Sequence, residues 1–148
     1  IMDGLGIRML VWAGLRVVLV SGRASRATSM RARELDVECL QEGTRKAPVV
    51  ARVLEEEGAG WGELATVADD LADLPLMRRA GLPVAVANAA PEIRAEARWV
   101  TSRAGGDGAA REFAEALLHA RGDWARVLAA YDRYLEEGGE VTDHLEAV

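Results

Sequence analysis

The stretch Val67-Ala68-Asp69-Asp70-Leu71-Ala72-Asp73-Leu74-Pro75 decides the fold assignment, because it places three carboxylates directly after a short apolar run. Carboxylates this close repel one another, and a hard cation such as Mg²⁺, which prefers oxygen ligands, would neutralise them. Asp70 could instead cap a helix over residues 71–80, with Asp73 in its favourable first turn. The stretch alone supports the metal site and the helix start equally.

A second strand end lies upstream of these aspartates. Residues 16–20 form a largely apolar run that we expect to be a buried strand, and Ser21-Gly22-Arg23 follows it. Functional residues of an open parallel sheet collect beyond the carboxyl ends of its strands, so Ser21 and Asp69 should lie at one edge.

Lys46 stands between these two strand ends in the sequence, at the start of a helix whose first turn contains Pro48. The helix dipole disfavours a cation there unless an anion also binds. Lys46 is therefore either an anion-binding residue or an ordinary surface lysine.

The remaining chain alternates short apolar runs with helical patterns, which predicts an α/β fold with a parallel sheet. We expect strands at residues 16–20, 37–40, 64–68, 82–86 and 99–101, and helices at 3–13, 26–35, 47–57, 74–80 and 91–97. Two helices complete the chain. The second, at 123–137, has Trp124, Val127, Leu128, Tyr131 and Leu135 on one face, which should pack against the body or a partner subunit.

Composition indicates one compact domain, because half of the 148 residues are apolar. We assign residues 1–122 to its core and residues 123–148 to a carboxyl-terminal helix and tail of the same domain. The formal net charge of −6 argues against nucleic acid or an anionic membrane as partner. Cys39 is the only cysteine, which excludes an intrachain disulfide and fits a cytoplasmic protein.

Six segments, in this order and spacing, resemble the 3-deoxy-D-manno-octulosonate 8-phosphate phosphatases, a branch of the haloacid dehalogenase-like phosphatases. They are Met2-Asp3-Gly4-Leu5-Gly6-Ile7, Ser21-Gly22-Arg23, Arg31-Ala32-Arg33-Glu34-Leu35, Gly43 to Lys46, Asp69 to Pro75, and Gly105-Gly106-Asp107-Gly108. The resemblance implies a Rossmann-like parallel sheet with helices on both faces. It also implies a cytoplasmic, Mg²⁺-dependent phosphatase that hydrolyses a phosphorylated sugar acid of lipopolysaccharide precursor synthesis through an aspartyl-phosphate intermediate.

The same resemblance assigns roles to individual residues. Ser21 and Lys46 would hold the phosphoryl oxygens as catalytic residues, and Asp69 would ligate Mg²⁺, with Asp70 and Asp73 supporting the metal loop. The residues implied to contact the substrate are Asp3, Gly4, Arg8, Arg23, Arg31 and Lys46. Arginines bind carboxylate and phosphate in a bidentate manner, which suits a phosphorylated sugar acid, although the alternative is three surface arginines.

The chain departs from the family in its first motif. It has no Asp-x-Asp-Gly-x-x-Thr segment, whose first aspartate is the nucleophile in these phosphatases and lies on the first, central strand of the sheet. We therefore expect a fragment, inactive as written, whose sheet lacks that strand between the ones ending at Ser21 and Ala68. Met2 replaces the usual arginine, and Ala68 replaces the usual glycine.

Two further expectations concern assembly and an alternative function. The family forms homotetramers, in which a glycine-rich segment matching residues 105–108 reaches a neighbour's active site, although these glycines could equally form an ordinary loop. Much of that interface comes from a hairpin preceding residue 1, so a tetramer of this chain is doubtful. The alternative function is a non-catalytic module of the same fold, for example one fused to or partnering a sugar-nucleotide transferase.

Overall fold

The computed structural model describes residues 2–145, so Ile1 and the end of the expected tail, residues 146–148, lie outside the described residues. The chain forms two compact units. Val18–Ala109 make up one, which we call the sheet unit. Ile1–Val17 and Ala110–Val148 make up the other, which we call the helical unit. The expected division of one domain at residue 122 stays a prediction.

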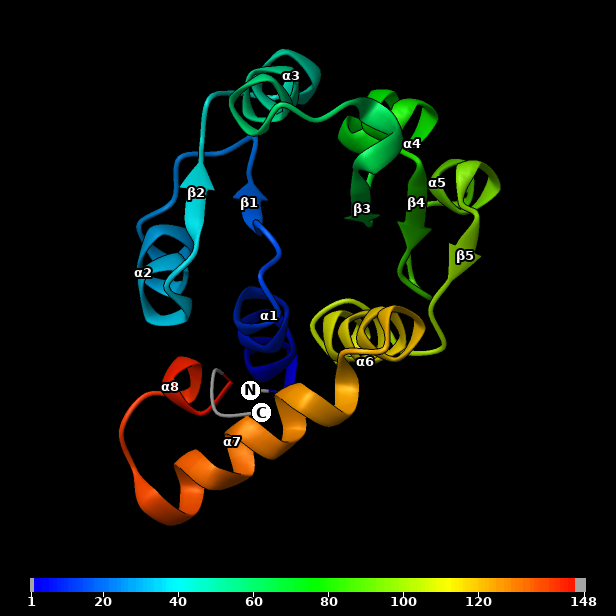
Figure 1. Ribbon diagram of the computed structural model, residues 1–148. Helices are drawn as coiled ribbons and strands as arrows, with labels where there is room; N and C mark the ends of the chain where they lie inside the picture. Colours follow the sequence, from blue (N-terminus) through cyan, green and yellow to red (C-terminus); the bar gives the residue numbers. More distant parts are fainter. Residues whose placement is uncertain (1, 146–148) are drawn as a thin grey trace. The chain divides into compact units, whose positions relative to one another are not determined.

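The sheet unit contains two parallel sheets (Figure 1). In the first, β1 (Val18–Val20) pairs with β2 (Glu38–Leu40). In the second, β3 (Ala65–Ala68), β4 (Leu82–Ala85) and β5 (Trp99–Val100) lie in the order β3-β4-β5. All observed pairings are parallel, which confirms the predicted α/β class.

Within residues 2–145, β1 does not pair with β3, so the two sheets have not closed on each other. Burial reflects this arrangement. The apolar strand β1 is only half-buried along its length, whereas Pro83, Val84 and Ala85 of β4, which has a strand on both sides, are buried. Val67 of β3 is 39% exposed. A strand edge without a neighbour leaves apolar side chains and backbone groups accessible.

Helices connect the strands of the sheet unit close to the predicted positions. They are α2 (Arg26–Leu35), α3 (Lys46–Glu57), α4 (Leu74–Arg79) and α5 (Pro91–Glu96), with the short 3₁₀ helices η1 (Trp61–Glu63) and η2 (Leu71–Asp73). Ser25 caps α2 by accepting a hydrogen bond from the Thr28 amide. Gly58, at φ +65°, ends α3 in the left-handed conformation that favours glycine.

Two apolar clusters hold the sheet unit together. One lies around β3 and β4 and consists of Ala68, Met77, Ala85, Val86, Ala89, Ile93 and Ala109. The other consists of Val50, Leu54 and Leu76, with Val20 of β1 and Leu64 packed against it. Because the second cluster includes side chains adjoining both sheets, it joins them without strand pairing.

The helical unit contains α1 (Met2–Trp12), α6 (Ala109–Arg121, whose first residue belongs to the sheet unit), α7 (Trp124–Glu137) and α8 (Val141–Leu145). Trp12 of α1 stacks on Tyr131 of α7, with ring centroids 5.6 Å apart. On the predicted apolar face of α7, Val127 is buried, whereas Leu128 and Leu135 are 43% and 61% exposed. Packing of these two leucines against a partner subunit stays a prediction. Among the helices in residues 2–145, none has the length and apolarity that a membrane span requires.

Gly81 provides a test of the packing at the amino ends of β3 and β4. Its amide donates to the carbonyl of Trp61, and an added Cβ would lie 2.0 Å from the carbonyl oxygen of Gly62. We expect Gly81→Ala to force the two backbones apart and to lower the free energy of unfolding by about 1–3 kcal/mol, measured by urea denaturation.

The matched control is Gly62→Ala, which alters the other side of the same contact. A Cβ at Gly62 meets nothing within 4 Å, so this variant should unfold at nearly the wild-type urea concentration. Equal loss of stability in both variants would contradict the proposed close approach.

Candidate active site

Ser21 directly follows β1, as predicted, and its hydroxyl lies in a local turn. Its Oγ donates to the Arg23 carbonyl at 3.0 Å and accepts from the Arg23 amide at 3.3 Å. The Ser21 amide donates to the Leu40 carbonyl at 2.9 Å, which continues the pairing of β1 with β2. The strand end therefore fixes the position of Ser21, and the turn orients its hydroxyl.

The loops that follow β1 and β2 contact each other at Gly22. A Cβ built on Gly22 would lie 3.3 Å from Thr44 Cγ2 and 3.4 Å from Thr44 Cα. These are tight contacts, so glycine lets the two loops approach. Ser21 is thereby held beside the loop that leads into Lys46.

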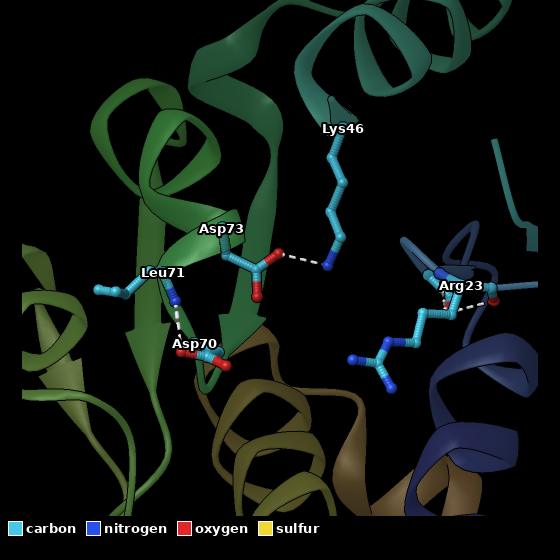
Figure 2. Close-up of polar contacts among 6 residues, drawn as sticks. Arg23, Lys46, Asp70, Leu71 and Asp73 are labelled. Carbon is cyan, nitrogen blue, oxygen red and sulfur yellow. Dashed lines mark hydrogen bonds and ion pairs between the residues drawn. The ribbon is translucent and has the colours of Figure 1, made fainter. Parts of the chain in front are cut away.

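Lys46 is the first residue of α3, as predicted, and it forms a partly buried ion pair. Its Nζ lies 2.7 Å from Asp73 Oδ1, and the two side chains are 13% and 11% exposed. Figure 2 shows the Lys46 side chain extending from the start of α3 toward Asp73. Lys46 is thus not an ordinary solvated surface lysine.

Asp69 and Asp70 occupy the turn after β3. The Asp69 carbonyl accepts a hydrogen bond from the Ala90 amide at 2.9 Å. Asp70 Oδ1 accepts from the Leu71 amide at 2.8 Å, so Asp70 caps η2. The helix-start interpretation of the acidic stretch is therefore correct for Asp70.

The fit of Mg²⁺ to this turn depends on Asp69. Across residues 2–145, the Asp69 carboxylate has no hydrogen bond or ion pair, and no three acidic, histidine or cysteine side chains are grouped to hold a metal. Mg²⁺ commonly takes one or two protein carboxylates and completes its shell with water and phosphate oxygens. The donor set present here would allow Asp69 to hold Mg²⁺. The roles of Asp69 as metal ligand and of Asp70 and Asp73 as supporting residues stay predictions.

The predicted arginine pocket is not assembled by direct contacts. Arg31 pairs with Glu34 on the exposed side of α2, with 3.2 Å between Nη1 and Oε2. Figure 2 shows the Arg23 side chain extending toward the side on which Lys46 and Asp73 meet. A shared anion pocket that includes Arg23 and Arg31 stays a prediction.

Asp3, Gly4 and Arg8 belong to the helical unit. Asp3 Oδ1 accepts hydrogen bonds from the amides of Ala110 and Arg111, at 3.0 and 3.3 Å, and so satisfies the first turn of α6. Gly4 is buried within α1. The Arg8 guanidinium lies 5.2 Å from the centroid of the Trp12 ring. The structure gives Asp3 and Arg8 packing roles, and their predicted contacts with substrate stay predictions.

Sequence reasoning missed the residues that follow β4 and β5. Asn88 Oδ1 accepts from the Gly105 amide at 2.8 Å. The Arg103 carbonyl accepts from the buried Thr101 hydroxyl at 2.6 Å and from the Ala87 amide at 3.2 Å. These contacts fix the glycine-rich loop, residues 105–108, at the edge of the sheet where Asp69 follows β3. Functional residues collect beyond the carboxyl ends of parallel strands, and this reasoning, which was applied to Ser21 and Asp69, could also have identified Asn88, Thr101 and Arg103.

Comparison with protein families agrees with the family resemblance found in the sequence. Residues 37–113 match the model of the haloacid dehalogenase-like hydrolases. These residues include β2 to β5 and therefore Lys46 and all three aspartates of the acidic stretch.

Individual relatives are phosphatases by name. The chain is 37% identical, over 121 residues and 81% of its length, to the 3-deoxy-D-manno-octulosonate 8-phosphate phosphatase KdsC of Escherichia coli K12, and it spans 64% of that relative. It is similar to the Moraxella catarrhalis phosphatase of the same name, crystallised with magnesium, phosphate and KDO. That similarity has a TM-score of 0.83 and 30% identity, and covers 88% of this chain and 75% of the other. The 3-deoxy-D-manno-octulosonate 8-phosphate phosphatase of Yersinia pestis is similar with a TM-score of 0.81 and 33% identity, and the match covers 84% of this chain and 68% of the other.

The capping role of Asp3 can be tested by stability. We expect Asp3→Ala to lower the free energy of unfolding by about 0.5–2 kcal/mol, because two amides of α6 lose their acceptor. Asp3→Asn, which retains a side-chain oxygen, should recover most of that loss in the same thermal or urea denaturation measurement. If both variants unfold like the wild type, Asp3 does not stabilise α6.

Proposed function

Because this chain belongs to the haloacid dehalogenase-like hydrolases, we propose that it forms part of a Mg²⁺-dependent phosphatase. The substrate we propose is a phosphorylated sugar acid, specifically 3-deoxy-D-manno-octulosonate 8-phosphate. The observation that carries the proposal is the ion pair of the partly buried Lys46, whose Nζ lies 2.7 Å from Asp73 Oδ1. Asp73 belongs to the acidic stretch that also contains Asp69. The names and identities of the relatives support the choice of substrate.

The chemistry follows from the charge that phosphoryl transfer develops. Negative charge spreads over the equatorial oxygens of the transferred group, and positive or hydrogen-donating groups stabilise it. We assign Lys46 and the Ser21 hydroxyl to those oxygens. Asp69 would hold Mg²⁺, which neutralises the same charge when bound.

The attacking group in this mechanism is an aspartate carboxylate that the 148 residues do not supply. Its oxygen forms a bond to phosphorus as the bond to the sugar oxygen breaks, and water then hydrolyses the aspartyl phosphate. No Asp-x-Asp segment occurs in the sequence. We therefore expect the 148-residue chain by itself to be inactive.

Arg23 is the arginine best suited to the substrate's anionic groups. It lies in the turn after β1, beside Ser21, and its side chain extends toward the Lys46 region (Figure 2). Asp3, Gly4, Arg8 and Arg31 complete the proposed set of substrate contacts. A cytoplasmic location and a homotetramer are part of the same proposal, and they rest on the family resemblance.

The test is phosphate release from 3-deoxy-D-manno-octulosonate 8-phosphate in the presence of Mg²⁺. We expect no release by the 148-residue chain and release by a version extended upstream to include an Asp-x-Asp strand. Activity of the extended version should disappear when the first aspartate of that motif is replaced by asparagine, because the nucleophile is then lost.

Absence of phosphate release from the extended protein would contradict the proposal. That result would favour the alternative function, a non-catalytic module of this fold that partners a sugar-nucleotide transferase. The replacement of the usual glycine by Ala68 next to Asp69 is the sequence feature that favours the alternative.

A further inference from the structure

We propose that Asp73 is a positioning residue for the Lys46 ammonium and does not support the metal. The inference rests on the proposed phosphatase function. It separates three neighbouring aspartates into three tasks: Asp69 for the metal, Asp70 for the turn and Asp73 for the lysine.

The first line of support is the environment of the ion pair. Lys46 and Asp73 are far apart in sequence, and their side chains are 13% and 11% exposed at a separation of 2.7 Å. A buried charge is costly unless it is paired, so each side chain needs the other. The need is greater for Lys46, because it stands at the amino end of α3, where the helix dipole disfavours a cation.

The second line of support is the turn that separates the aspartates. Asp70 uses Oδ1 to cap η2, and the Asp73 amide donates to the Asp70 carbonyl at 3.0 Å. This 3₁₀ turn aims Asp73 at Lys46, whereas Asp70 remains at its own turn (Figure 2).

The pair matters for catalysis because a lysine side chain is long and flexible. Its four-carbon stem samples many rotamers when unrestrained. An ion pair to a buried carboxylate restricts the ammonium to one region before substrate arrives. Preorganised charge of this kind stabilises the transition state without reorganisation during the reaction.

The first experiment measures the ion pair in the 148-residue chain, without reference to activity. We expect Asp73→Asn and Lys46→Met each to lower the melting temperature, because each leaves a buried charge unpaired. The double variant should lose less than the sum of the two single losses. Additive losses would show that the two side chains do not interact and would overturn the proposal.

A matched control uses an exposed ion pair of the same unit. Arg52 and Glu42 are bonded at the surface, with side chains 50% and 42% exposed, and the hydrogen bond from Arg52 holds the pKa of Glu42 below its usual value. Glu42→Gln and Arg52→Met should change the melting temperature little, because solvent replaces the lost partner.

The second experiment measures the function of the pair in the extended, active protein. We expect Asp73→Asn to lower kcat for phosphate release by about 100-fold, because the ammonium loses its fixed position. The Mg²⁺ concentration for half-maximal activity should stay unchanged. Asp73→Asn should cause no further loss in a Lys46→Met background, and Asp73→Glu should restore part of the rate.

Two outcomes would overturn the positioning role. A raised Mg²⁺ requirement in Asp73→Asn, with additive effects of the Lys46 and Asp73 variants on kcat, would assign Asp73 to the metal. An unmodified extended protein that releases no phosphate would remove the proposed function and the positioning role together. In that case, the melting temperatures would still report whether the ion pair exists.

Discussion

The polarity of the parallel strands is the constraint on which the site depends. Because β3, β4 and β5 run in the same direction, the turns that follow them lie at one edge of their sheet. Neighbouring strands in a sheet are about 4.8 Å apart, so these turns are close together. Asp69 follows β3, and Asn88 follows β4. The Asp69 carbonyl accepts a hydrogen bond from the Ala90 amide, and Asn88 Oδ1 accepts one from the Gly105 amide. Each turn is therefore bonded to the turn that follows the neighbouring strand. Short loops therefore acquire fixed positions from the sheet, as a candidate active site requires.

The sheets themselves are joined by packing and by charge. Val50, Leu54 and Leu76 form an apolar cluster against which Val20 of β1 also packs. Lys46, which starts the helix after β2, pairs with Asp73, which follows β3. Since β1 and β3 are not paired within residues 2–145, these contacts carry the connection between the residues that we assign to the phosphoryl group and to the metal.

Local patterns predicted the elements well, whereas distant partners could not be predicted. Apolar runs and caps gave β1 to β5 and most helices to within about two residues, as expected for local signals. Pro48 correctly placed Lys46 at the start of α3. The partner of Lys46 and the capping of α6 by Asp3 depend on tertiary contacts that no local pattern contains. The exposure of Leu135 has the same origin, since helical periodicity defines a face but not what covers it.

The chain carries the electrostatic part of the proposed catalyst and not the attacking group. We propose that Lys46, Ser21 and, through Mg²⁺, Asp69 stabilise the charge on the phosphoryl oxygens, and electrostatic stabilisation is usually the largest contribution to such catalysis. These three residues depend on strand ends and on the Asp73 ion pair, all of which form within Val18–Ala109. The contacts that position these three residues are therefore formed within this one unit and do not include the nucleophile.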